Sequence, residues 1–155
     1  MAPEAYEGFL AMIDYNDAYM LAEICGKPVD DNPETNYPYG LLNAERSIKI
    51  FDIGLGTGLV GRHLTAHGFT HVDGGDASAE FCRAAESTNC YQDVREIWFG
   101  IGTDQLPANL IGAYDVVTCA GCFLEGHIPC AGFEDAVAML KVGGHFMTSL
   151  RKSYW

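Results

Sequence analysis

Basic residues are scarce in this sequence. The 155-residue chain has nine Lys and Arg against 21 Asp and Glu, which gives a formal net charge of −12 at pH 7. Proteins that bind nucleic acid neutralise its phosphates with a basic surface. The composition therefore disfavours nucleic acid as a substrate or partner, and it favours a small neutral or cationic molecule or a protein. The same acidity also has a simpler explanation, because it keeps a protein soluble.

Long apolar runs are missing as well. No run approaches the roughly 18–20 residues that a membrane-spanning helix needs. The opening residues, MAPEAYEGF, lack the basic and then apolar pattern of a secretory signal. We therefore expect a cytoplasmic protein with no membrane partner. The length suits one domain, and the apolar fraction of 48% is ordinary for a globular core.

The six cysteines lack a metal-binding pattern. Cys119 and Cys122 form a CxxC pair, but no second pair follows at the spacing of a zinc site. Cys119 also falls inside a predicted strand. An even number of cysteines suggests disulfides only in a secreted chain. We therefore expect buried free thiols and no metal site.

The most informative stretch is KIFDIGLGTGLVGRHL, residues 49–64. A short apolar run rich in β-branched and aromatic residues stops at Gly54, and Gly56 and Gly58 follow at every second position. A segment with helical spacing comes next. The pattern predicts a strand, a tight turn and a helix. Glycines suit a turn with positive φ that a ligand approaches closely, and the helix N-terminus adds free N–H groups.

Two glycine registers overlap in this stretch. Gly56, Gly58 and Gly61 spell GxGxxG, the dinucleotide fingerprint, which would indicate an NAD(P)-dependent oxidoreductase. Alternatively, Asp52 and the glycines at 54, 56 and 58 spell DxGxGxG, which begins where the strand stops. The Asp52 carboxylate would repel a pyrophosphate but attract an ammonium or sulfonium group. We therefore favour the second register and keep the oxidoreductase as an alternative.

Three further segments extend the pattern. Residues 71–78 (HVDGGDAS), 114–121 (YDVVTCAG) and 140–150 (LKVGGHFMTSL) follow in order. With the glycine turn, they resemble the second, fourth and fifth strands of the class I S-adenosylmethionine-dependent methyltransferases. In detail, GTGLVGRHLTAHGF and GHIPC resemble the methyltransferase-like 27 (Williams–Beuren region) group. The resemblance implies S-adenosylmethionine as cofactor and methyl transfer to a small molecule or a protein.

The resemblance also implies a cofactor site. Asp76 would hold the ribose hydroxyls, the turn would meet the amino-acid end, and Asp104 would lie in the loop against the adenine. The implied cofactor-binding residues are Asp52, Gly54, Gly56, Thr57, Gly58, Asp76, Ala77, Asp104 and Cys119. Tyr15 and Tyr19 are weaker candidates for contact with the methionine end. No catalytic residue is assigned, although Glu125 or His127 would be placed to act as a base.

Strands alternating with helices predict a parallel sheet with right-handed crossovers. We expect an α/β, Rossmann-like three-layer sandwich of strand order 3-2-1-4-5, with an N-terminal helix and connector over residues 1–46 and the core over 47–155. The predicted strands are 47–53, 71–74, 96–99, 114–120 and 145–150. The predicted helices are 3–24, 59–67, 78–87 and 133–140, with 27–43 as an irregular connector. The inward residues of the last two helices are expected to be Phe81, Cys82, Ala85, Phe133, Ala136, Val137 and Leu140.

The family fold carries a strand hairpin after the fifth strand, and this sequence has none. We therefore expect strand five to be an exposed edge. Either the chain is a truncated form, or this edge is covered by a partner chain or by a second copy in a homodimer. A second hypothesis follows, in which the chain is a non-catalytic methyltransferase-like module that binds or assembles with a partner.

Overall fold

The computed structural model describes residues 2–12, 17–19, 21 and 46–150. Its centre is a five-stranded parallel sheet of order β3-β2-β1-β4-β5, which confirms the predicted topology. The strands are β1 (Lys49–Ile53), β2 (His71–Asp76), β3 (Asp93–Glu96), β4 (Tyr114–Cys119) and β5 (Leu140–Thr148).

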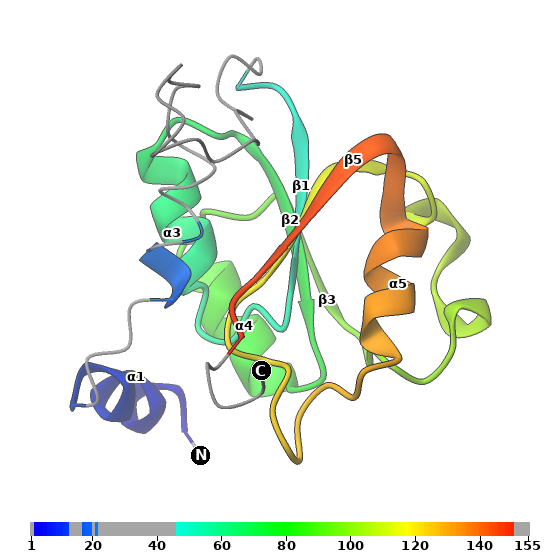
Figure 1. Ribbon diagram of the computed structural model, residues 1–155. Helices are drawn as coiled ribbons and strands as arrows, with labels where there is room; N and C mark the ends of the chain where they lie inside the picture. The colour runs from blue at the N-terminus through cyan, green and yellow to red at the C-terminus, as the bar shows by residue number, and fades with distance from the viewer. Residues whose placement is uncertain (1, 13–16, 20, 22–45, 151–155) are drawn as a thin grey trace, which may run out of the picture.

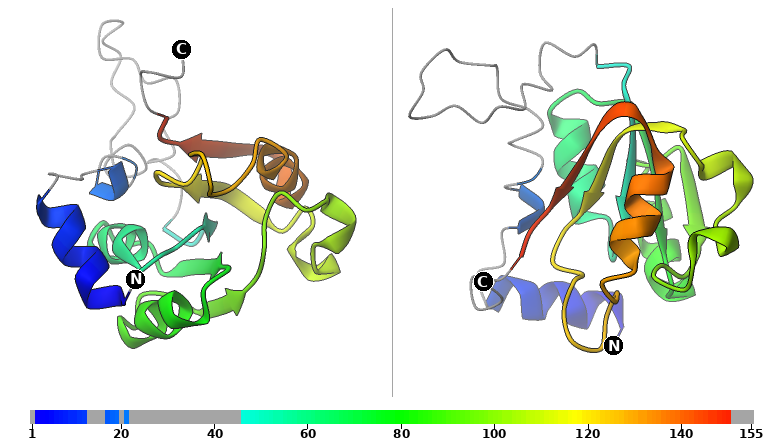
Figure 2. Two further views of the ribbon diagram at one scale, coloured as in Figure 1. Left: turned by 90° about the horizontal axis from the view of Figure 1, so that it is seen from below. Right: turned by 45° about the vertical axis from the view of Figure 1, so that its right-hand side comes forward.

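Helices cover both faces of the sheet, as expected for a three-layer sandwich. The helices are α1 (Pro3–Met12), α3 (Leu59–Ala66), α4 (Ala79–Ser87) and α5 (Gly132–Met139), with 3₁₀ turns η2 (Thr103–Gln105) and η3 (Ala108–Leu110). Figure 1 shows α3 and α4 on one face and α5 on the other, and the view from below in Figure 2 shows the same layers. Within the described parts of the chain, no helix is long and apolar enough to cross a membrane.

Alternation along the central strands divides the apolar residues between two cores. Ile50 and Val116 pack with α3 on one face, whereas Phe51 and Val117 pack with α5 on the other. The Phe51 ring makes edge contacts with Phe99 and Tyr114, at centroid distances of 6.1 and 5.0 Å. These strands are buried on both sides, as parallel strands generally are.

β3 and β5 differ most from the predicted bounds. β3 ends at Glu96 rather than starting there, because the following apolar residues leave the ladder and Phe99 packs inward against Phe51. β5 starts at Leu140, opposite Tyr114, and an irregularity in register precedes the pairing of Val116 with His145. In both cases the hydrophobic pattern locates buried residues correctly but not the hydrogen-bonded ladder.

The inward faces of α4 and α5 are partly as predicted. Cys82, Ala85 and Ala136 are buried, but Val137 is 63% exposed. Ala136 and Met139, three residues apart, define the buried line of α5, and Val137 lies one position off it. Phe81 is only partly buried and packs on Tyr6 of α1, with ring centroids 5.0 Å apart.

Helix α1 lies at the end of the molecule where the strands finish, beside α4 (Figure 1). The loop after β4 reaches the same end. Open α/β sheets generally bind their ligands at this carboxyl edge. Tyr15, Cys25, the predicted connector and the last five residues lie outside the described residues. The division of the chain at residue 46 stays a prediction.

Candidate cofactor site

The turn after β1 has left-handed backbone at each of its three alternating glycines. The φ angles are +67° at Gly54, +53° at Gly56 and +85° at Gly58, values that a residue with a Cβ rarely adopts. The Gly54 amide donates to the Gly75 carbonyl of β2 at 2.8 Å. A Cβ at Gly54 would also collide with the thiol of Cys122. The turn is therefore bare backbone fixed between two neighbouring strands.

Gly61, the last glycine of the dinucleotide register, has a different role. It lies inside α3, and it is not one of the positive-φ glycines. A Cβ there would collide with the ring of Tyr91, whose hydroxyl accepts a hydrogen bond from the Gly61 amide at 2.9 Å. Gly61 thus makes room for a tyrosine rather than for a ligand. This geometry favours the register of Gly54, Gly56 and Gly58.

Asp52 lies beneath the turn and is 1% exposed. The Tyr91 hydroxyl donates to its Oδ2 at 2.8 Å, and the Thr118 hydroxyl donates to its Oδ1 at 2.9 Å. Burial raises the pKa of Asp52 to about 7; these two hydrogen bonds oppose the shift, and the charge of Asp76 adds to it. Asp52 braces the turn from inside, and its direct contact with a cofactor stays a prediction.

Asp76 stands at the carboxyl end of β2 and faces the turn. Its Oδ2 accepts a hydrogen bond from the Gly56 amide at 3.1 Å, and its Oδ1 accepts one from the Ser78 amide at 2.8 Å. Ala77 lies half-buried between them. A carboxylate has about four acceptor positions, so Asp76 can accept further donors while it stays in place.

Thr57 contributes a buried polar atom with no partner. Its side chain is buried, and its Oγ1 makes no hydrogen bond within the described structure. The pKa of Glu7 is lowered mainly by Arg62 and also by the Thr57 hydroxyl, which therefore lies close to that carboxylate. Buried hydroxyls in native proteins are generally satisfied. An unpaired hydroxyl on a glycine turn therefore suits a site whose ligand completes the bonding.

The aromatic ring over the turn belongs to Tyr6 of α1. A Cβ at Gly56 would lie 3.7 Å from the Tyr6 ring, and the ring also packs on Phe81. Burial raises the pKa of Tyr6, and the nearby Cys122 and Asp76 raise it further, so the phenol stays neutral. The sequence pattern missed Tyr6, because it is only one of several apolar residues on the N-terminal helix.

An ion pair joins α1 to α3. Arg62 donates to Glu7 at 2.7 Å and lowers the pKa of that carboxyl. Tyr19, one of the expected tyrosines, instead makes an edge contact with His63 on α3, with ring centroids 5.5 Å apart. The structure thus places Tyr6, which was not among the predicted tyrosines, over the turn, whereas Tyr19 packs on α3.

The CxxC pair lies under the same edge. Cys119 is buried at the end of β4, and its carbonyl accepts a hydrogen bond from the Thr148 hydroxyl at 2.9 Å. Its thiol pKa is raised well above the usual value by hydrogen bonding to Cys122 and by burial. The five cysteines within the described residues are free thiols, but only Cys82 and Cys119 are buried as predicted, and Cys130 is exposed. Those residues contain no cluster of three or more potential metal ligands.

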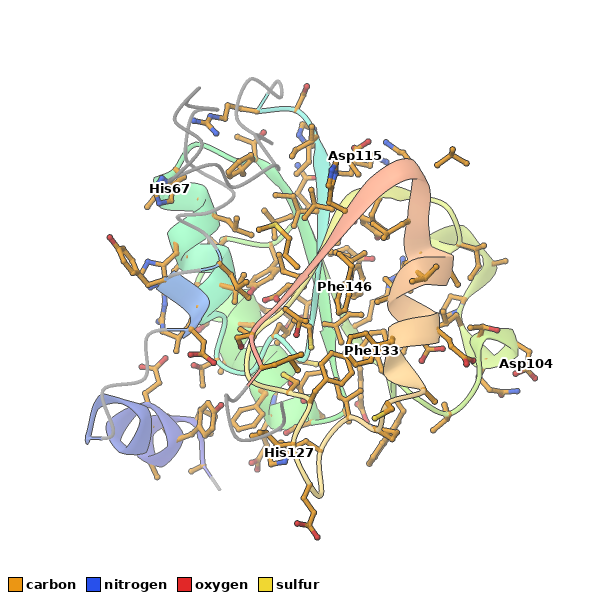
Figure 3. The ribbon with its side chains drawn as sticks, in the orientation of Figure 1. His67, Asp104, Asp115, His127, Phe133 and Phe146 are labelled. Carbon is orange, nitrogen blue, oxygen red and sulfur yellow. The ribbon has the colours of Figure 1, made fainter. Side chains whose placement is uncertain are left out.

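Other predicted residues lie further away. Asp104 is exposed on η2, where it accepts a hydrogen bond from the Gln105 side chain at 2.8 Å. Figure 3 shows Asp104 beyond α5, on the opposite side of the molecule from α3, and its predicted contact with an adenine stays a prediction. Glu125 and His127 are exposed on the loop after β4, and Figure 3 shows His127 at the carboxyl edge.

Replacing Tyr91 by Phe tests the brace under the turn. The Tyr91→Phe variant leaves the buried Asp52 oxygen without its donor and the Gly61 amide without its acceptor. We expect the free energy of unfolding to fall by about 2 kcal/mol, measured by urea denaturation. Tyr114→Phe is the matched control, because its hydroxyl donates at 3.0 Å to the half-buried Asp73, and about 1 kcal/mol or less is expected. Equal losses in the two variants would contradict the special position of Tyr91.

The raised pKa of Asp52 predicts a pH dependence. Between about pH 4 and pH 7 the folded protein keeps a proton on Asp52 that the unfolded chain releases. Stability should therefore fall as pH rises through this window, by up to about 4 kcal/mol, and level off above it. Denaturation of wild type and Asp52→Asn at a series of pH values isolates this contribution from the other titrating groups.

The Asp52→Asn variant is expected to fold. Thr118 already lies 3.4 Å from the Phe51 carbonyl, so its hydroxyl can donate there and accept from the new amide. Parallel stability curves for the wild type and the variant would show that Asp52 does not titrate in this range.

Comparisons with known proteins also indicate a methyltransferase. A sequence profile described as a methyltransferase domain matches residues 50–144. Human methyltransferase-like protein 27 is 33% identical over 98 residues, which are 63% of this chain and 38% of that protein. The chain therefore spans well under half of the length of this curated relative.

Solved structures show the same fold. A Haloferax volcanii protein, described as a putative methyltransferase in complex with the Trm112 methyltransferase activator, is 20% identical with a TM-score of 0.63, covering 92% of this chain and 54% of that one. A TehB-like S-adenosylmethionine-dependent methyltransferase from Corynebacterium glutamicum is 22% identical with a TM-score of 0.59, covering 94% and 71%. These comparisons give no support to the oxidoreductase alternative. The chain therefore belongs to the methyltransferase domain family.

Proposed function

We propose that this chain binds S-adenosylmethionine at the glycine turn and transfers its methyl group to a small molecule or a protein. The observation that carries the proposal is the placement of the Asp76 carboxylate on the Gly56 amide, at 3.1 Å. This hydrogen bond places a carboxylate that can accept from a ribose diol beside a turn without side chains, at the carboxyl edge of the sheet.

The residues around the turn fit this cofactor. Positive φ at Gly56 and Gly58 keeps side chains off the turn, and the Thr57 hydroxyl is buried without a partner. Asp76 would hold the ribose hydroxyls, and the turn amides would meet the amino-acid end. A cationic ligand near the buried Asp52 would lower its raised pKa and would then be attracted by the ionised carboxylate.

The bound cofactor would supply a methyl group on a sulfonium, which is ready for an in-line displacement. This chain would align the reactants and exclude water. The Tyr6 ring, packed over Gly56 and held by the Glu7–Arg62 ion pair, serves the exclusion of water. We assign no general base, and Glu125 and His127 are proposals for that role only. A cytoplasmic location is also proposed, and the free thiols support it.

Mutation of Asp76 tests the cofactor site. Calorimetric titration of the wild-type chain with S-adenosylmethionine and S-adenosylhomocysteine should give saturable binding. Asp76→Ala should weaken both by at least about tenfold, because a charged acceptor of two hydroxyl donors is lost. Glu86→Ala removes an exposed carboxylate in the last turn of α4, at the opposite end of that helix from Asp76, and should leave binding unchanged. Absence of binding by the wild type at millimolar ligand would reject the proposal.

A second candidate function is a binding or assembly module. Among the described residues β5 pairs with β4 alone, and none of its residues is fully buried. We propose that its outer edge is covered by a partner chain or by a second copy of this chain. The Haloferax volcanii relative was solved with an activator protein, which supports a protein partner.

Light scattering combined with a methyl-transfer assay on a substrate pool distinguishes the two candidates. A dimer, or a chain that is active only with a partner, is expected if the β5 edge is an interface. An active monomer would remove the module hypothesis.

A further inference from the structure

Asp135 is a buried carboxylate outside the glycine turn. It is the fourth residue of α5 and is 1% exposed. Its Oδ2 accepts a short hydrogen bond, 2.6 Å, from the Gly100 amide, and its Oδ1 has no partner in the described structure. Burying a carboxylate is costly unless its hydrogen bonds offset the loss of water. The burial of this carboxylate in α5 therefore indicates a role other than hydrophobic packing.

The partner of Asp135 belongs to the loop that leaves β3. Gly100 has a φ of +79°, and a Cβ there would collide with Pro129. Pro129 in turn accepts a hydrogen bond from the Gly132 amide at 2.8 Å, at the start of α5. The loop after β3, the loop after β4 and α5 therefore meet at Gly100, and Asp135 provides the charge-assisted bond that holds the junction.

The loop that carries this junction begins beside the proposed ribose site. Asp76 pairs with Glu96 across the parallel ladder, and the Ile97 amide donates to the Asp76 carbonyl at 2.9 Å. The loop that carries Gly100 starts directly from this pair. If Asp76 holds a ribose and the glycine turn holds the amino-acid end, the base must extend toward the neighbouring loops.

We propose that Asp135 is a positioning residue that fixes the base-binding loop. It sets the position of the Gly100 backbone and thereby the selectivity for adenine. The proposal rests on the proposed function, because it assigns the base of the same cofactor to this loop. Asp104, the acidic residue expected there, is exposed and makes only a local hydrogen bond, so the loop is held in place from α5 instead.

The test compares two ligands that differ only in the base. Isothermal titration of the full chain with S-adenosylhomocysteine and S-inosylhomocysteine gives a ratio of affinities. We expect the wild type to prefer adenine and Asp135→Ala to reduce that ratio about tenfold, the effect of one charge-assisted hydrogen bond. Asp135→Asn keeps an acceptor for the Gly100 amide and should restore most of the ratio. Glu134→Gln, an exposed neighbour on α5, is the matched control and should change nothing.

The base-selectivity ratio separates positioning from stability, because a purely structural role would weaken both ligands equally. A ratio in Asp135→Ala equal to that of the wild type would overturn the inference, as would a wild type with no preference. If Asp135→Ala does not fold, Gly100→Ala moves the same loop from the side of Pro129 and should lower the ratio in the same way. A wild type that binds neither ligand would reject the proposed function itself.

Discussion

The hydroxyl of Tyr91 is the link on which the glycine turn depends. It accepts from the Gly61 amide of α3 and donates to the buried Asp52 of β1, so one atom joins the helix after the turn to the strand before it. The ring fits only because Gly61 and Gly74 have no side chains. Without this link, the buried carboxylate would lack a donor and the first turn of α3 would lose its support.

The two carboxylates of the site are placed to act differently. Asp52 is enclosed, with each oxygen bonded to a neutral hydroxyl, and burial favours its protonated form. Asp76 is only partly buried, and two backbone amides hold it in the orientation that faces the turn. The inner group therefore maintains the geometry, while the outer group keeps acceptor capacity for a ligand. Their mutual repulsion raises the pKa of Asp52, and a cation near both would offset it.

Much of this arrangement could be predicted from the sequence, because the strand order and the glycine turn follow from local patterns. The choice between glycine registers could not be made with certainty, because a glycine may supply either a positive φ or an empty volume. Gly56 supplies a positive φ, whereas Gly61 leaves an empty volume for the Tyr91 ring. Only the position of Tyr91 distinguishes the two roles. Tyr91 itself carries no local signal, since its partners are 30 and 39 residues away in sequence.

The incorrect predictions for α5 also arise from tertiary contacts that the local sequence does not show. Val137 is apolar but exposed, whereas the charged Asp135 is buried because the Gly100 amide meets it there. Asp104, the acidic residue of its loop, is exposed, and its contact with an adenine stays a prediction. Hydrophobic periodicity locates an element, but the partner of a polar side chain is decided by chain segments far away in sequence.

The ion pair between Glu7 and Arg62 spans 55 residues of sequence, and the contact between Tyr6 and Phe81 spans more. Closing such a loop costs chain entropy that is recovered only when both ends have a surface to meet. The docking surface for α1 consists of α3 and α4, which require the sheet. Folding kinetics should therefore show the N-terminal helix arriving after the central strands, so that the cover over the glycine turn is completed in the last stage of folding.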